Sequence, residues 1–171
     1  QPARVQGNLS GTNWQFINDC SRLHEYIAFT QNGYLIPDAL GKVQNQDLHG
    51  SSQVNYIIIT EDELLAQAKR LADYHKQRDG FSSIVVTASQ VFNEFSSGSP
   101  DPTALRDFVK MFYDKAGSDT TLRPKYLLLF GDASFDYKNR LKNTTNKVPS
   151  YESEISLDPL NTYTSDDFFG F

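Results

Sequence analysis

Cysteine is nearly absent from this sequence, and its scarcity excludes several kinds of site. Cys20 is the only cysteine among 171 residues. A single thiol cannot form an internal disulfide framework or a cysteine-rich zinc site. Long hydrophobic runs are missing as well, since no apolar stretch approaches the roughly 20 residues that a transmembrane helix needs. The first residues show no signal-peptide pattern, and because Gln1 is not a natural start we expect an excised piece of a longer protein.

Basic charge and glycine-rich loops are also in short supply. The chain carries 16 basic and 21 acidic residues, a formal net charge of -5, which argues against a general nucleic-acid-binding protein. No glycine-rich loop follows an expected strand, and only Gly131 stands behind the apolar run at 126–130. A phosphate cradle is therefore not expected, and no cofactor is predicted.

Apolar and aromatic residues, by contrast, are plentiful. Hydrophobic residues make up 39% of the chain and aromatic residues 13%, enough for a folded core. The apolar run from Tyr126 to Phe130 predicts a central strand covered on both faces. Gly131 and Asp132 follow at the carboxyl edge, where ligands gather in open α/β sheets. Asp132 is interpreted either as part of a site or, more simply, as the cap of the next turn.

Strands and helices alternate before and around this run. A short buried strand is expected at 56–59, and Thr60 with Glu63 has the spacing of a helix capping box. The elements expected next are a helix ending at Asp79-Gly80, a strand at 84–86, a short helix at 88–95 and a helix from Asp101-Pro102 to Gly117.

This alternation predicts an α/β fold with a doubly wound, mainly parallel sheet. Right-handed crossovers place strand 84–86 outside strand 56–59, with 126–130 on the other flank. Thr60 and Asp132 would then lie near one crevice. The predicted domains are residues 1–52 as an irregular or β N-terminal extension, residues 53–140 as the α/β subdomain, and residues 141–171 as a loop and the start of a second subdomain.

The flanking segments give weaker signals. Asn32-Gly33 predicts a hairpin turn, and segments 13–19 and 25–30 are each interpreted as a short strand or a turn of helix. Near the end, Val148-Pro149 and Tyr163-Thr164 are expected to be extended. The aromatic residues Phe168, Phe169 and Phe171 are expected in the middle of a strand, which makes the end of the chain abrupt.

The cysteine and the histidines are the residue types that could supply a nucleophile and its base. Cys20 would need a histidine beside it. His24 follows closely, and His49-Gly50 is similar to the His-Gly step of several cysteine peptidases. Since Cys20 lies in an irregular segment with no strand ahead of it, we predict a structural or incidental thiol. His75 falls on the apolar stripe of a helix and is expected to be packed.

Acidic residues gather late in the chain and raise the question of a metal. Calcium binds several oxygens at once, but the spacing of a calcium loop is absent. Turn caps and solvated surface are the simpler interpretation, so calcium stays open and no metal ligand is assigned. Asn8 and Asn143 also stand in N-glycosylation patterns, which often arise by chance. The acidic residues concerned are Asp132, Asp136, Glu152, Glu154, Asp158, Asp166 and Asp167.

Five motifs follow one another along the chain. They are NQDLHG at 45–50, VFNEFSSGSPDPTALRDFVKMFYD at 91–114, LLLFGDASFDYKNR at 127–140, VPSYESE at 148–154 and TSDDFFGF at 164–171. In this order they resemble gingipain-type cysteine peptidases, and within that family the PorU-like sortases of the type IX secretion system of Bacteroidetes. The resemblance covers roughly residues 25–171.

The resemblance implies a caspase-like α/β fold of two subdomains in a cell-surface, outer-membrane enzyme. It implies thiolate attack on a peptide carbonyl, assisted by histidine, to give a thioester. Water would resolve the thioester in proteolysis, and an amine of lipopolysaccharide would resolve it in sorting. The implied partners are cargo proteins with C-terminal secretion signals, which the enzyme removes, and outer-membrane secretion components.

No catalytic residue is carried over from the resemblance. The family's catalytic histidine and cysteine come after the segment that matches 164–171, so this piece alone is expected to be inactive. Two other interpretations stay open: a non-catalytic α/β binding or adhesion module, and a small hydrolase that uses Asp132. The reading frame after Phe171 separates them, since a His-Gly step and a cysteine there favour the peptidase and a stop codon favours the module.

Overall fold

The computed structural model describes residues 3–33, 35–39, 41–134, 136–142, 146–153 and 164–170. The chain divides into two compact units, Gln1–Val43 and Gln44–Phe171. Several residues interpreted from the sequence lie outside the described parts: Phe135, Asn143, Glu154, Asp158, Tyr163 and Phe171.

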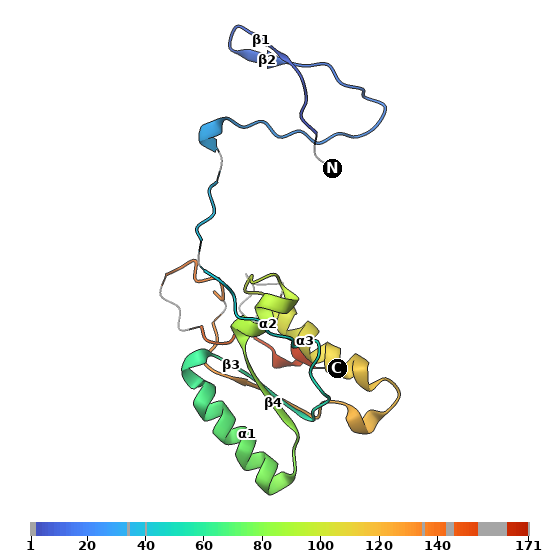
Figure 1. The fold of residues 1–171 in the computed structure, drawn as a ribbon, viewed down its shortest axis with the longest axis vertical. Coiled ribbons are helices and arrows are strands. Elements are labelled where there is room, and N and C mark those ends of the chain that lie inside the picture. Colours follow the sequence, from blue (N-terminus) through green and yellow to red (C-terminus); the bar gives the residue numbers. More distant parts are fainter. Residues whose placement is uncertain are drawn as a thin grey trace. The chain divides into compact units, whose positions relative to one another are not determined.

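The first unit contains a small antiparallel hairpin (Figure 1). Strand β1 (Asn8–Ser10) pairs with β2 (Asn13–Gln15), and Gly11 adopts a positive φ of 61° in the turn between them. The hairpin expected at Asn32-Gly33 is wrong. Residues Gln31–Gly33 form a short 3-10 turn, closed by a 2.9 Å hydrogen bond from the Gly33 amide to the Thr30 carbonyl. An Asn-Gly pair makes a hairpin only where both flanks can pair as strands, and in the described residues these flanks do not.

The second unit is built on a parallel three-stranded sheet. Its strands are β3 (Tyr56–Thr60), β4 (Ser83–Thr87) and β5 (Tyr126–Phe130), in the order β4-β3-β5. Ile58 lies opposite Val85 on one side and Leu128 on the other. The predicted α/β fold with its parallel sheet and the predicted strand order are therefore confirmed.

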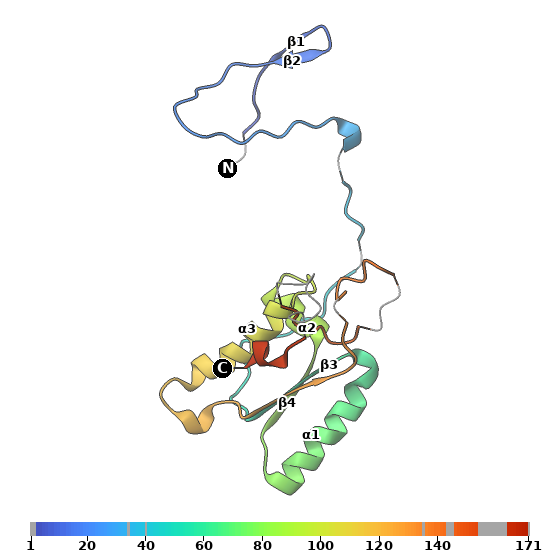
Figure 2. The same cartoon turned by 180° about the vertical axis from the view of Figure 1, so that it is seen from behind.

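Helices cover both faces of this sheet (Figures 1 and 2). On one face, α1 (Leu65–Asp79) packs Ala68 and Ala72 against Tyr56 and Ile58. On the other face, α2 (Ala88–Phe95) and α3 (Pro102–Ala116) form the larger core cluster with Ile57 and Ile59. The described residues include no helix with the length and apolarity needed to cross a membrane.

Strand β5 corrects one expectation about position in the sheet. All five residues of β3 are buried, whereas β5 is half-buried and Tyr126 is 52% exposed. Among the described strands, β3 is central and β5 is at the edge. An unbroken apolar run shows that helices cover both faces of a strand, but it does not show how many strands flank it.

The helix ends confirm some of the sequence signals and correct others. Helix α3 begins as predicted, with the Asp101 carboxylate accepting a 2.8 Å hydrogen bond from the Thr103 amide and Pro102 in the first turn. Helix α1 ends at Gly80, which adopts a left-handed φ of 70°. The capping box expected at Thr60 is wrong. Thr60 is the last residue of β3, and the short 3-10 turn Asp62–Leu64 (η2) precedes α1 without a side-chain cap.

The aromatic pair near the end of the chain is helical, not extended. Phe168 and Phe169 belong to a 3-10 turn, Asp166–Phe169 (η4), in which the Ser165 hydroxyl accepts from the Asp167 amide. Phe169 is fully buried, and the Arg106 side chain donates a 2.8 Å hydrogen bond to the Phe168 carbonyl. The strand expected here is therefore wrong, because a serine cap and tertiary packing on α3 outweigh the β preference of phenylalanine.

Candidate active-site cavity

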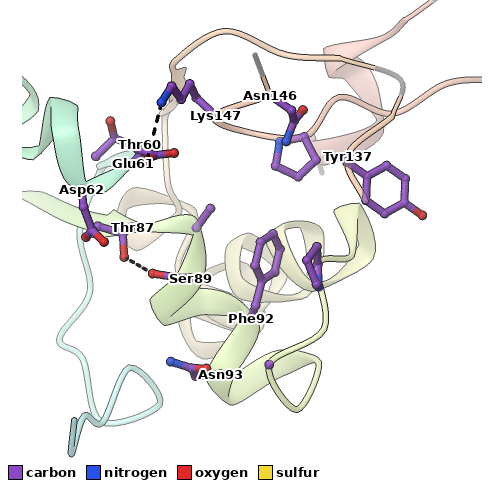
Figure 3. A pocket seen from close by; sticks show the side chains of 14 residues that line it. Thr60, Glu61, Asp62, Thr87, Ser89, Phe92, Asn93, Tyr137, Asn146 and Lys147 are labelled. Carbon is purple, nitrogen blue, oxygen red and sulfur yellow. Dashed lines mark hydrogen bonds and ion pairs between the residues drawn. The ribbon is translucent and has the colours of Figure 1, made fainter. Parts of the chain in front are cut away.

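A cavity of about 340 Å³ lies at the carboxyl edge of β3 and β4 (Figure 3). Parallel α/β sheets hold their ligands at this edge, and the volume falls within the range of small-molecule pockets. Its walls come from the two strand ends, from α2, from the turn between α2 and α3, and from the chain after β5. The lining residues are Thr60, Glu61, Asp62, Thr87, Ala88, Ser89, Phe92, Asn93, Gly98, Pro100, Tyr137, Asn146, Lys147 and Pro149.

Two threonines at the strand ends make fixed polar contacts in the cavity. The fully buried Thr60 donates a 2.8 Å hydrogen bond to the Phe130 carbonyl and so ties β3 to β5. The Thr87 hydroxyl lies 2.9 Å from the Ser89 hydroxyl and accepts from the Gln90 amide, while the Gln90 side chain accepts from the Thr87 amide. This reciprocal pair is a capping box that begins α2.

The upper wall in Figure 3 belongs to a loop whose two ends meet. The Asp132 carbonyl accepts hydrogen bonds from the Lys147 amide at 2.8 Å and the Val148 amide at 3.1 Å. We call the described residues of this loop, 132–134, 136–142 and 146–147, the neck-closed loop. A surface loop of this kind, with its ends joined and its own internal bonds, is often functional. A Cβ on Gly131 would stand 2.9 Å from the Lys147 Cβ, so the neck needs a glycine there.

Internal hydrogen bonds shape the neck-closed loop. The Ser134 amide donates to the Asn146 side chain at 2.9 Å. The Asp136 carboxylate, only 7% exposed, accepts from the Arg140 amide at 2.9 Å and the Leu141 amide at 2.7 Å. Asp136 therefore acts as a buried turn cap, and the loop presents Tyr137, Asn146 and Lys147 to the cavity.

An ion-pair cluster joins the neck-closed loop to the end of β3. The Lys147 ammonium lies 2.8 Å from the Glu63 carboxylate and 3.7 Å from that of Glu61. The hydrogen bond from Lys147 lowers the pKa of Glu63, and the same bond raises the pKa of Lys147. Because Glu63 is largely exposed, this pair orients the loop more than it stabilises the fold.

The residues singled out in the sequence fall in different places. Thr60 lines the cavity, but Asp132 does not; its backbone closes the loop, and its carboxylate accepts from the Ala133 amide at 3.0 Å. The Glu63 carboxylate accepts a hydrogen bond from Lys147 and does not cap a helix. Phe92, Asn93 and Asn146 were missed, since no local pattern shows that segments so far apart in the sequence form one cavity.

Among the described residues of the first unit, Cys20 and His24 do not form a nucleophile–base pair. The exposed Cys20 contacts the Asn18 carbonyl at 3.7 Å, and the buried Nε2 of His24 has no hydrogen-bond partner. His49 pairs with Glu94 at 2.7 Å and stacks on Phe95.

His75 is packed, as the apolar stripe predicts. Its ring lies against Tyr56 and Phe81 and contacts the Asp79 carboxylate at 2.6 Å. The assignment of no catalytic residue to this sequence stays a prediction.

Of the late acidic residues that the structure describes, Asp136 caps a turn with its carboxylate. Glu152 forms an isolated backbone β-bridge with Thr164, and Asp166 and Asp167 lie in the 3-10 turn η4. In the described ranges no three histidine, cysteine, aspartate or glutamate side chains come together as metal ligands.

Glu94 is an acid of the second unit with a strongly lowered pKa, and no local sequence signal marked it. It accepts hydrogen bonds from the Leu48 amide at 2.7 Å, the Gln46 side chain at 2.8 Å and the amide and ring of His49. Burial raises the pKa of this carboxyl, but the hydrogen bonds outweigh burial and lower the pKa from its ordinary 4.5 to about 2. Glu94 thus fixes segment 46–49 against α2.

The family of the chain follows from comparison with known sequences. The model of peptidase family C25 matches residues 49–171, which include the sheet, its helices and every residue of the cavity. The chain belongs to peptidase family C25, and the resemblance to gingipain-type cysteine peptidases is confirmed.

The chain is also similar to a solved structure. The crystal structure of dimeric latent PorU from Porphyromonas gingivalis is similar to this chain, with 38% sequence identity and a TM-score of 0.65. The similarity covers 77% of this chain and 13% of the PorU chain, so the sequence spans only a small part of that relative. No match is found among curated proteins.

Proposed function

We propose that this chain is the first subdomain of a gingipain-type cysteine peptidase whose complete protein acts as a sortase of type IX secretion. The C25 match over residues 49–171 carries the proposal, and the 38% identity to PorU supports its narrower form. Residues 53–140 would form the subdomain, 141–171 would lead into the second subdomain, and 1–52 would be an N-terminal extension or the end of a preceding β-domain.

In the proposed reaction, this chain helps to bind the peptide, and the catalytic cysteine and histidine are residues not assigned in it. A cysteine thiolate attacks the scissile carbonyl of cargo, histidine protonates the leaving amine, and a thioester remains. Water then releases a free carboxylate, or an amine of lipopolysaccharide forms a new amide, at the surface of the outer membrane. The carboxyl edge of the sheet would contribute a peptide-binding wall to this site, while Cys20 and His49 would take no part.

The test is reaction of the full-length parent with a peptide that carries a thiol-directed electrophile. We expect one covalent adduct on the parent and none on this 171-residue chain. Incubation with cargo bearing a C-terminal signal domain would then show by mass whether the product is hydrolysed or joined to an amine. A parent that forms no adduct and leaves cargo intact would contradict the peptidase and favour a non-catalytic module.

A further inference from the structure

The two ends of the cavity differ in chemistry. Thr60, Glu61 and Asp62 stand at the strand end, with Lys147 above them, whereas Tyr137 stands at the far end beyond Phe92 (Figure 3). The rings of Pro100 and Pro149 add apolar surface to the lining. The cavity therefore has one polar end and one apolar wall.

The polar end carries an excess of negative charge. Glu61 and Asp62 line the cavity, and Glu63 shares the Lys147 ammonium with Glu61. Two carboxylates thus share one ammonium, and Asp62 adds a further negative charge to the lining. A ligand carboxylate entering here would meet like charges with no unengaged cation at the lining, so acidic ligands are disfavoured.

The remaining polar groups of the cavity suit a peptide backbone. The hydroxyl of Ser89 and the side-chain amides of Asn93 and Asn146 can each donate and accept hydrogen bonds. A peptide group offers one donor and one acceptor, so these side chains match it without adding charge. Phe92 and Tyr137 then supply the aromatic surface that an apolar side chain needs.

We propose that this cavity binds a peptide segment through an apolar side chain, held between Phe92 and Tyr137, and rejects a segment with an acidic side chain at that position. The inference rests on the proposed function, because it names the peptide feature that a peptidase of this family would hold at the edge of its first subdomain. Tyr137 is the specificity-determining residue, and Lys147 is a positioning residue that fixes the neck-closed loop.

Titration of the isotopically labelled chain, followed by amide NMR, tests the proposal. The probes are N-acetyl-phenylalaninamide and N-acetyl-aspartamide with a free side-chain carboxylate. We expect saturable shifts at Ser89, Asn93 and Asn146 with the phenylalanine probe and binding about tenfold weaker, or none, with the aspartate probe. Equal affinity for both probes, or no saturable shift at these residues with either probe, would overturn the proposal.

Variants in the cavity sharpen the test. Tyr137→Ala is expected to weaken the phenylalanine probe about fivefold, because the loop keeps its Asp136 cap while the aromatic surface is lost. Asp62→Asn is expected to reduce the difference in affinity between the phenylalanine and aspartate probes, because it removes one negative charge and leaves Lys147 paired. Tyr74→Ala, which removes a 51% exposed tyrosine outside the cavity, should change neither affinity. A Tyr137→Ala variant that binds the phenylalanine probe as tightly as the unsubstituted 171-residue chain would contradict the role of Tyr137 in binding.

The titration and the adduct experiment fail separately. Saturable shifts in this chain together with an unreactive full-length parent would support the proposed peptide binding and contradict the proposed peptidase activity. A reactive full-length parent, together with no saturable shifts in this chain, would support the proposed peptidase activity and contradict the proposed peptide binding.

Discussion

Some single side chains hold distant segments of the chain together although no local sequence pattern marks them, and Glu94 is one example. Its carboxylate holds the backbone amides of Leu48 and His49 with the side chains of Gln46 and His49. Removing the carboxylate would leave two amides near a core residue, Leu48, without their acceptor. That loss is larger than the loss of an exposed ion pair.

We predict that Glu94→Gln lowers the free energy of unfolding at pH 7 by about 1–3 kcal/mol, since a neutral amide accepts fewer and weaker hydrogen bonds. The pKa of Glu94 falls to about 2 on folding, so its contribution is present above about pH 4.5 and is lost as the pH falls toward 2. Urea unfolding at pH 7, 5 and 3 should therefore show the difference between parent chain and variant shrinking with pH.

Asp73→Asn is the matched control for this prediction, because Asp73 is exposed on α1. Its free energy of unfolding should stay close to that of the parent chain at all three pH values. If Glu94→Gln and the parent chain keep the same difference from pH 7 to pH 3, the carboxylate is not the group that titrates.

At the scale of elements, α3 shows how a local signal can fix a helix. Asp101 caps the helix, Pro102 occupies its first turn, and Gly117 follows its last residue. We predict that Asp101→Ala costs about 1 kcal/mol of stability, because the Thr103 amide loses its acceptor, while Asp101→Asn keeps the cap and costs only a few tenths. Urea denaturation of the two variants measures the difference, and equal losses would mean that the charge, not the hydrogen bond, sustains the helix start.

The elements predicted correctly are those whose signals lie within a few residues. Strand β3 and helix α3 carry apolar periodicity and end signals in their own sequence. Thr60 has a capping pattern too, but its hydroxyl is used by the Phe130 carbonyl of a distant strand. The real capping box, Thr87 with Gln90, has the same spacing and was overlooked. Pattern alone could not decide between them, since tertiary contacts determine which threonine is free to cap.

At the scale of the whole molecule, the two units carry different optical probes. The only tryptophan, Trp14, lies in the first unit, while the two core clusters and the long helices lie in the second. We predict that unfolding followed by tryptophan fluorescence and by far-UV circular dichroism gives two transitions that do not coincide. A chain of residues 44–171 should keep the circular-dichroism transition, because both clusters remain intact. Coincident transitions in the full chain, or loss of the cooperative transition in residues 44–171, would contradict this independence.

The cavity could not have been predicted at this scale. The sheet order indicates which edge is chemically important, and Thr60 was placed there correctly. The other wall depends on the hydrogen bonds that the backbone amides of Lys147 and Val148 donate to the Asp132 carbonyl, across a polar stretch with no periodicity. Neither composition nor spacing indicates such a contact, so only the folded structure shows that Phe92 and Tyr137 line the same cavity.

The joined ends of the neck-closed loop have a consequence for protein engineering. Since the amides of Lys147 and Val148 are anchored by hydrogen bonds to the carbonyl of Asp132, we expect the sheet to tolerate changes in the length and composition of the segment between Asp132 and Lys147. Segments of other lengths could be grafted between these anchors, provided that Gly131 is retained, and ligand preference could be exchanged without redesigning the scaffold.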